Sequence, residues 1–293
     1  MQAPSKIVLG TVQFGLEYGV NNVSGKPNDK AIRSILDFAF DNNIRLLDTA
    51  EAYGNSQEVI GNYHRLSSNK FEIITKFSAG RKDLSRNLQE RIRHDLSVLN
   101  IGSLYCYMFH SFNDFRTYFG SYKNEIRELK NAGVIRKFGV SVYTNNEIEE
   151  LLKEENIDII QLPFNLLDNS NQRSFVIEKA KKRGIEIHAR SVFLQGLFFK
   201  NAKELPNKLT SLEPYLAAIN KTSKGNNLSL NTLSLNYVMQ QKNIDNVLIG
   251  VDSVEQLKEN IKSLKSEISA TVMREIDSIN VKETSLLNPS NWN

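Results

Sequence analysis

Four side chains suited to acid–base chemistry stand at or just after the ends of short apolar segments: Asp48, Tyr53, Lys76 and His110. An isolated phenol has a pKa of about 10, too high to exchange protons freely at neutral pH. A nearby ammonium group favours the phenolate and lowers that pKa, and an aspartate can hold the ammonium group in place. Tyr53 would then act as a general acid or base for a carbonyl and alcohol pair, while a neutral His110 donates a hydrogen bond to the carbonyl.

None of these side chains can supply a hydride, so the chemistry requires a nicotinamide cofactor. Taken singly, each residue has a simpler explanation, because a strand-end aspartate often caps a loop and a lone histidine is usually structural. Their arrangement after successive apolar segments favours a site instead. By contrast, His64 and His94 fall in helical stretches and His188 inside an apolar segment, so we interpret these three as surface or packing residues.

The segments that precede the four residues read as buried strands. Residues 45–47 lead to Asp48, residues 71–75 to Lys76 and residues 104–109 to His110. Further strands are predicted at residues 7–9, 137–140, 157–162, 185–189 and 246–249, and amphipathic helical stretches separate them. Eight strand–helix units are the count that closes a (β/α)8 TIM barrel, an α/β fold with its chemistry at the carboxyl ends of the strands. We expect one such domain over residues 1–293.

Local signals support this assignment. Asn28 and Ser56 are predicted to cap helices, and Gly133 and Gly184 to end them. Residues 200–242 exceed the length of one helix, so two helices are expected there. The structural rival is an open doubly wound sheet, but residues 10–15 do not fit its glycine-rich phosphate turn.

Composition excludes several classes of partner. The formal net charge is +4 over 293 residues, and lysine and arginine are dispersed, so neither a nucleic-acid nor a membrane surface is indicated. Residues 179–183 form the densest basic cluster, which we interpret as the solvated end of a helix. Cys106 is the single cysteine and lies in an apolar segment, as expected of a buried thiol in a reducing, cytoplasmic protein. No apolar segment reaches membrane-spanning length.

Other chemistries fit the residues less well. A metal hydrolase would need several ligands at strand ends, and only His110 and Asp48 qualify, so no metal is expected. Serine nucleophile chemistry lacks the Gly-x-Ser-x-Gly turn. A cofactor-free lyase or epimerase with Lys76 as its base remains open.

Several segments resemble the aldo-keto reductase family, and the resemblance covers nearly the whole chain. They are residues 47–54 (LDTAEAYG), residues 73–76 (IITK), residues 108–110 (MFH) and residues 133–141 (GVIRKFGVS). The resemblance implies an oxidoreductase acting on CH–OH groups, in which Tyr53 donates the proton. It further implies that Lys76 and Asp48 lower the Tyr53 pKa and that His110 orients the carbonyl.

The same resemblance implies a cofactor site of NADPH, with NADH as the alternative. Its residues are Gly10, Thr11, Asp48, Ser141, Gln161, Arg190, Ser191, Gly250, Val251, Ser253, Gln256, Glu259 and Asn260. Four positions depart from the family pattern. Val142 stands where many members carry asparagine, and Arg190 where an aromatic residue usually stacks on the nicotinamide. Gly250 and Gln256 replace the basic residues that often bind a 2′-phosphate, and Asp252 is close by, which is unfavourable to that phosphate.

Residues 189–197 and 10–15 resemble a bacterial branch often found with surface-polysaccharide genes, which implies a sugar or sugar-nucleotide carbonyl as substrate. Four aromatic residues are candidates for its binding wall: Phe14, Tyr18, Phe112 and Phe193. The alternative is a nucleotide-sensing regulatory subunit with the same fold and little turnover. We expect a monomer or weak homodimer, and a polar tail at residues 285–293 that either closes the pocket or hangs free.

Overall fold

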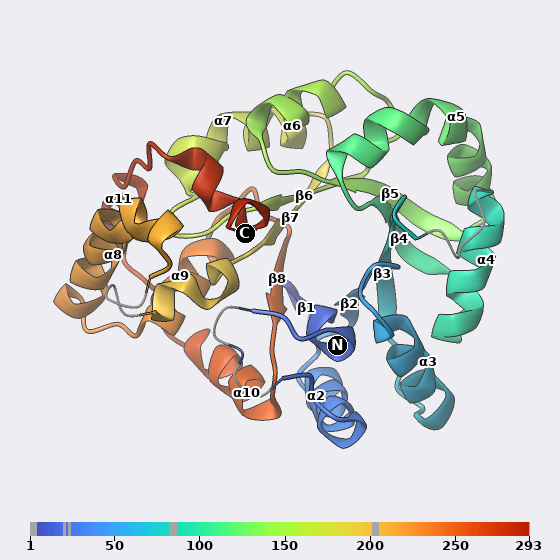
Figure 1. The fold of residues 1–293 in the computed structure, drawn as a ribbon, viewed down its shortest axis with the longest axis horizontal. Helices are drawn as coiled ribbons and strands as arrows, with labels where there is room; N and C mark the ends of the chain where they lie inside the picture. Colours follow the sequence, from blue (N-terminus) through green and yellow to red (C-terminus); the bar gives the residue numbers. More distant parts are fainter. Residues whose placement is uncertain (1–4, 20–21, 23–24, 82–86, 201–204, 293) are drawn as a thin grey trace.

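The computed structural model describes residues 5–19, 22, 25–81, 87–200 and 205–292, and its strands form a closed barrel of eight parallel strands (Figure 1). The strands are β1 Ile7–Gly10, β2 Leu46–Asp48, β3 Glu72–Phe77, β4 Leu104–Phe109, β5 Ile135–Ser141, β6 Ile159–Pro163, β7 Glu186–Arg190 and β8 Asn246–Gly250. Each pairs with the next, and β8 closes on β1 with Ile7 opposite Val247. The predicted (β/α)8 barrel is confirmed, and the open sheet is excluded.

Helices surround the strands (Figure 1). The longer ones are α2 Asp29–Asp41, α3 Ser56–Leu66, α4 Leu88–Leu99, α5 Phe112–Asn131, α6 Asn145–Leu151, α7 Ser170–Lys182, α8 Glu213–Gly225, α9 Leu230–Met239, α10 Val254–Ser263 and α11 Ala270–Asp277. Short turns are α1 Val12–Gly15, η1 Leu194–Phe199, η3 Asn207–Leu212, η4 Thr284–Leu287 and η5 Pro289–Asn291. The two helices expected before the last strand are α8 and α9, whereas α11 was not predicted. No helix in these ranges combines the length and apolar character that a membrane crossing requires.

Alternation along the strands determines which side chains enter the barrel. A small inner cluster holds Val8, Leu46, Ile74, Cys106, Met108 and Ile159, and a larger cluster packs the outer strand faces against the helices. Because side chains two positions apart share a face, the residues two positions beyond Leu46, Ile74 and Met108 also face inward. These residues are Asp48, Lys76 and His110. Three predicted site residues therefore lie directly above the inner apolar layer.

Most helix boundaries follow the predicted signals. Asn28 caps α2 by accepting a hydrogen bond from Ala31 N at 2.9 Å, and Gly133 and Gly184 adopt positive φ angles of 70° and 75° after α5 and α7. The predicted Ser56 cap is wrong, because Ser56 is already the first residue of α3. Its buried hydroxyl instead donates to Thr11 O at 2.9 Å and ties the helix to the loop after β1.

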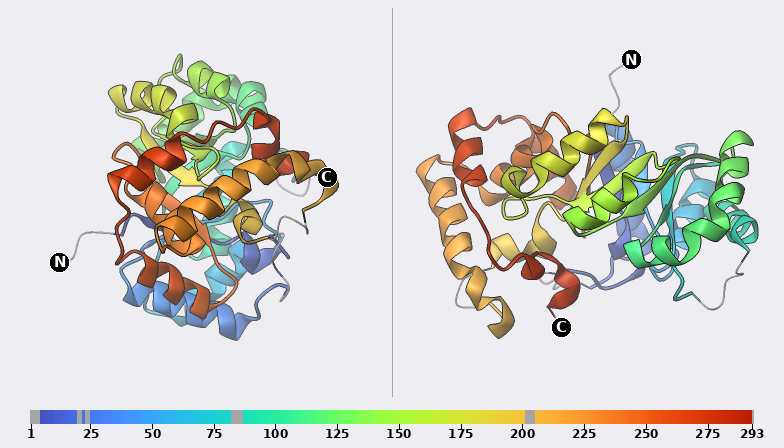
Figure 2. Two further views of the ribbon diagram at one scale, coloured as in Figure 1. Left: turned by 90° about the vertical axis from the view of Figure 1, so that its left-hand side faces the viewer. Right: turned by 90° about the horizontal axis from the view of Figure 1, so that it is seen from above.

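The chain beyond β8 packs against the barrel instead of hanging free. Helices α8 and α11 lie side by side (Figure 2), and Tyr215 Oη donates to Glu283 Oε2 at 3.0 Å. In the tail, Leu287 is buried and Trp292 Nε1 donates to Leu286 O at 2.8 Å. No tail residue that the structure describes lines the cavity discussed below.

Candidate active site

A buried ion pair occupies the barrel where β2 and β3 end. Lys76 Nζ donates to the Asp48 carboxylate and, at 3.0 Å, to Thr49 O, and both side chains of the pair are 1% exposed. The second Asp48 oxygen accepts from Gln161 Nε2 at 2.8 Å. Burial lowers the pKa of Lys76, and the Asp48 carboxylate opposes that shift. Asp48 thus holds the ammonium group in place, as predicted.

Tyr53 and His110 lie beside this pair. The Tyr53 and His110 rings meet edge to face with centroids 5.4 Å apart, and Lys76 Nζ lies 5.1 Å from the centroid of the Tyr53 ring. The structure therefore brings all four predicted catalytic residues together. Within the described chain, Lys76 Nζ donates to Asp48 and Thr49, with no hydrogen bond to the Tyr53 hydroxyl.

The pKa of Tyr53 is raised, whereas the sequence predicted a lowered value. Burial raises the pKa of Tyr53 above its ordinary value, the Asp48 carboxylate raises it further, and the Arg190 guanidinium opposes both effects. Lys76 is not among the groups that lower this pKa, although its Nζ lies 5.1 Å from the centroid of the Tyr53 ring. The phenol is consequently held in its protonated form, which is the form that a general acid requires.

His110 is neutral, as predicted. Burial, together with the positive charges of Lys76 and Arg190, lowers the pKa of His110 to about 3. Its ring therefore keeps one N–H group and one lone pair across the physiological range, and can donate a hydrogen bond without carrying charge.

The loop that carries Tyr53 is held by a second buried ion pair. Glu51 accepts from Arg91 on α4, from Tyr107 Oη at 2.9 Å and from Ser78 N at 3.0 Å. Glu51 is 1% exposed and Arg91 3% exposed, so water does not screen this pair. The sequence offered no signal for it, because the partners lie 27 to 56 residues from Glu51.

Glycine is required where the β1 loop meets the Tyr53 loop. A Cβ on Gly15 would lie 1.8 Å from Tyr53 O, closer than any real side-chain contact. Across this contact, Gly54 has a φ of 55°, and a Cβ there would lie 2.5 Å from Gly15 O. The two glycines let the backbones touch and so set the position of Tyr53.

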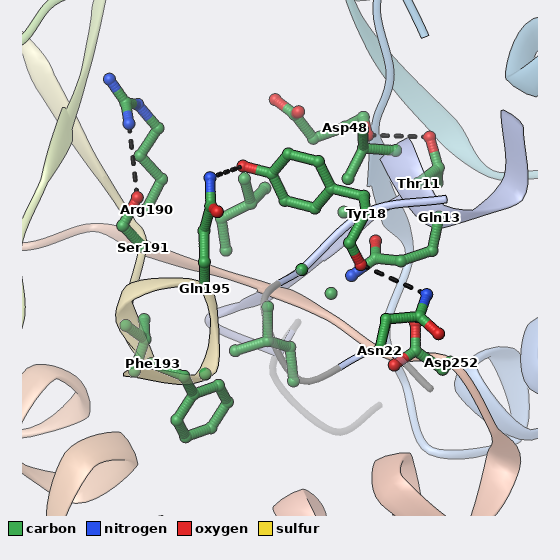
Figure 3. A pocket seen from close by; sticks show the side chains of 18 of the residues that line it. Thr11, Gln13, Tyr18, Asn22, Asp48, Arg190, Ser191, Phe193, Gln195 and Asp252 are labelled. Carbon is green, nitrogen blue, oxygen red and sulfur yellow. Dashed lines mark hydrogen bonds between the residues drawn. The ribbon is translucent and has the colours of Figure 1, made fainter. Parts of the chain in front are cut away.

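A cavity of about 520 Å³ is lined by Tyr53 and His110 and also by Asp252 and Gln256. Figure 3 shows this pocket from close by, with Asp48 and Asp252 among the labelled lining residues. Eleven of the thirteen residues predicted to contact a cofactor line it: Gly10, Thr11, Asp48, Ser141, Gln161, Arg190, Ser191, Gly250, Gln256, Glu259 and Asn260. The other two do not. Val251 is buried, and Ser253 caps α10 by accepting from Gln256 N at 3.2 Å.

The cavity lining also includes residues outside the predicted cofactor contacts, and only some of these were predicted from the sequence. Tyr18 Oη accepts from Gln195 Nε2 at 2.8 Å, which joins the loop after β1 to η1 (Figure 3). Gln195 has a φ of 54°, one of several positive φ values between Ser191 and Gly196, as is common where backbone strain serves a site. Of the four predicted aromatic wall residues, Tyr18 and Phe193 line the cavity, whereas Phe14 and Phe112 pack in the core.

The cavity suits an elongated dinucleotide. Of the buried side-chain polar atoms that lack a hydrogen-bond partner in the described chain, two belong to residues that line the cavity, Gln13 Oε1 and Arg190 Nε. A Cβ on Gly250 would lie 2.5 Å from the Gln13 amide, so glycine keeps this stretch open. No cluster of three or more potential metal ligands occurs in the ranges described.

Comparison with known proteins agrees with this geometry. The Aldo/keto reductase family matches residues 6–281. An uncharacterized oxidoreductase, YqkF, of Bacillus subtilis is 27% identical over 87% of this chain and 89% of its own. The NADH-specific methylglyoxal reductase of Escherichia coli is 27% identical over 80% of this chain and 83% of its own.

Among solved structures, the aldo-keto reductase AKR11C1 from Bacillus halodurans in its holo form superposes with a TM-score of 0.76. It is 20% identical and covers 96% of this chain and 95% of its own, so it supports the fold. Since the family match spans the barrel and the site residues converge within it, the chain belongs to the aldo/keto reductase family of NAD(P)H-dependent oxidoreductases.

Proposed function

We propose that this protein reduces an aldehyde or ketone to an alcohol, with Tyr53 as the proton donor. The observation that carries the proposal is the meeting of Tyr53, His110 and the Asp48–Lys76 pair at one end of an elongated cavity. A bound nicotinamide cofactor supplies the hydride that no side chain can provide. The whole chain, residues 1–293, acts in this proposal as one barrel domain.

The side chains divide the work on the carbonyl oxygen. His110, neutral and edge-on to Tyr53, donates a hydrogen bond that orients the carbonyl and polarises it. Tyr53 donates its proton to the oxygen as negative charge develops there. The phenolate that remains is stabilised by the Arg190 guanidinium, while Lys76, held in place by Asp48, lies beside the Tyr53 ring.

The polar residues at the barrel mouth hold the cofactor in this proposal. Ser141 and Gln161 stand beside Asp48 and bind the carboxamide, while Gly10, Thr11 and Ser191 line the path toward Gly250. Gln256, Glu259 and Asn260 lie on α10 at the adenosine end. Val251 and Ser253 contribute indirectly, by shaping the start of that helix.

The choice between NADPH and NADH depends on charge at this end. The family expectation is NADPH, and it stays a prediction. Two carboxylates, Asp252 and Glu259, line the cavity there and disfavour a 2′-phosphate. One relative of this chain is an NADH-specific reductase. We therefore propose that NADH binds at least as well as NADPH.

The substrate end is polar. Tyr18, Tyr143, Arg190 and Gln195 line the cavity around Tyr53, with Phe193 as an apolar surface. Hydroxyl, amide and guanidinium groups beside an aromatic wall suit a polyhydroxylated carbonyl such as a sugar or sugar nucleotide. We further propose a cytoplasmic monomer or weak homodimer, in keeping with the single buried cysteine, Cys106.

The test uses purified full-length protein with NADH, NADPH and a panel of aldehydes, ketones and sugars. Cofactor consumption is expected for the wild type, whereas Tyr53→Phe should lose about 10²-fold or more in kcat and still bind cofactor. Full turnover by Tyr53→Phe would overturn the assignment. Cofactor binding without turnover of any carbonyl by the wild type would favour a nucleotide-sensing subunit. Turnover without cofactor would favour the lyase or epimerase.

A further inference from the structure

One positive charge at the reaction end of the cavity has no matching negative charge. Arg190 ends β7, and its guanidinium donates to Val142 O at 3.1 Å and to Ser191 Oγ at 3.3 Å. The guanidinium carbon lies 4.1 Å from the centroid of the Tyr143 ring. Within the described ranges, no carboxylate lies at ion-pair distance from Arg190, and its Nε is buried without a partner.

Arg190 is partly buried, and the two buried arginines of the described chain behave differently from it. Arg173 binds the Asp168 carboxylate through Nη2 at 2.7 Å, and Arg91 binds Glu51. Each of these pairs is neutral as a unit and stands outside the cavity lining. Arg190 differs from both, because its guanidinium contacts one carbonyl oxygen, one hydroxyl oxygen and the face of an aromatic ring. None of these groups carries a negative charge.

Among the charged residues that line this end in the described part of the chain, Arg190 is the one without an ion-pair partner. Asp48 and Lys76 form a buried ion pair with each other, and His110 is neutral. The Arg190 charge reaches this end, since it lowers the pKa of both Tyr53 and His110. The acidic lining residues Asp252 and Glu259 stand at the opposite end of the cavity, on the segment after β8 (Figure 3 labels Arg190 and Asp252).

The proposed reaction changes the charge of the cofactor ring in this region. A reduced nicotinamide ring is neutral. When it gives a hydride, which carries two electrons, to the carbonyl carbon, the ring becomes a cation while the oxygen takes the Tyr53 proton. In the proposed reaction the carbonyl oxygen must lie within hydrogen-bond reach of Tyr53, so the hydride donor must lie in the same part of the cavity. An uncompensated guanidinium nearby therefore repels the oxidised ring and leaves the reduced ring unaffected.

From this we infer that Arg190 makes the protein bind reduced nicotinamide cofactor more tightly than oxidised cofactor. The inference rests on the proposed function and adds a direction to it. In a mixture of equal concentrations, most protein molecules would carry the reduced form, and the oxidised form would leave readily after each turnover. Because most protein molecules would hold the reduced cofactor, the protein would act mainly as a reductase. The overall equilibrium of the reaction is unchanged.

Calorimetric titration without carbonyl substrate tests this, because it measures both dissociation constants directly. Full-length wild type, Arg190→Gln and Arg190→Lys are each titrated with NADH and NAD⁺, and then with NADPH and NADP⁺. The wild-type ratio of the oxidised to the reduced dissociation constant should be about tenfold or more. Arg190→Gln should lower that ratio by about tenfold, and Arg190→Lys, which keeps the charge, should stay close to the wild type.

The ratio of the two dissociation constants distinguishes an effect of the Arg190 charge from an effect of its packing against the cofactor. If Arg190 only packs against the cofactor, its loss weakens both forms equally and leaves the ratio unchanged, which would overturn the inference. Equal loss of the ratio in the Gln and Lys variants, or a wild-type ratio of one or less, would also overturn it. The wild-type measurement needs no variant, so it decides even if a variant fails to fold. Absence of binding and turnover in the wild type would instead remove the proposed function itself.

Discussion

The Tyr107 hydroxyl on β4 donates a hydrogen bond of 2.9 Å to the Glu51 carboxylate on the loop that carries Tyr53. Arg91 on α4 binds the same carboxylate, with its Nε 3.2 Å from Oε1. This buried cluster holds the loop that carries Tyr53 through Glu51, and Gly15 contacts the same loop at the Tyr53 backbone. The position of the proposed proton donor thus depends on residues that do not line the cavity.

Removing the Arg91 charge should destabilise the protein. Arg91→Met leaves the buried Glu51 carboxylate without its cation, and we expect unfolding to become easier by about 3 kcal/mol. Tyr107→Phe removes one neutral donor to a charged acceptor and should have a smaller effect, about 1.5 kcal/mol. Urea unfolding measures both. Arg93→Met, an exposed change on the same helix, is the control and should shift stability by less than about 0.5 kcal/mol. An Arg91→Met protein as stable as this control would contradict the anchoring role.

A side chain at Gly15 should displace Tyr53. The added Cβ of Gly15→Ala would lie 1.8 Å from Tyr53 O, so one of the two backbones must move. We expect loss of stability by more than about 2 kcal/mol and a fall in kcat, measured by thermal unfolding and carbonyl reduction. Gly120→Ala is the matched control, since a Cβ at that position on α5 meets nothing within 4 Å. It should be neutral or slightly stabilising.

His110 should make the protein sensitive to acid. Its folded pKa of about 3 lies below the ordinary value of 6.5, so the unfolded state binds more protons between these pH values. The contribution of His110 to stability is therefore complete above pH 6.5 and falls by about 1.4 kcal/mol for each pH unit below it. His110→Gln removes this dependence. Urea unfolding at pH 7.5, 5.5 and 4.5 should show the stability difference between wild type and variant moving in favour of the variant as pH falls. Parallel pH curves would contradict the buried neutral state.

Lys76 and Asp48 should behave as one unit in catalysis. Lys76→Met removes the ammonium group and Asp48→Asn removes the carboxylate that holds it, so each should lower kcat by about 10²-fold or more. Because both changes disrupt the same buried pair, the double variant should lose little more than the worse single variant. Steady-state kinetics of the three proteins, with cofactor dissociation constants as the control, measure this coupling. Losses that multiply would show that the two residues act independently.

Much of this protein was determined by the sequence alone. Apolar segments that alternate with amphipathic helices predicted eight units and a closed barrel, and the structure confirms it. The period of two along a strand is a local property of the chain, so Leu46 and Asp48, or Ile74 and Lys76, must share the inner face wherever the strands lie. The residues that end neighbouring parallel strands then meet at one end of the barrel.

The tertiary structure determined the pKa shifts and the long-range partners of the site residues, which the strand pattern cannot predict. The Tyr53 pKa is raised because burial and Asp48 outweigh Arg190, and that balance depends on distances between separate strands. Ser56, predicted as a helix cap, faces the β1 loop instead, and Glu51 finds its partners on α4 and β4. Charge and burial depend on every neighbour in space. The residue types could therefore predict which groups would meet, and only the folded chain determined which charges cancel and which, like that of Arg190, remain.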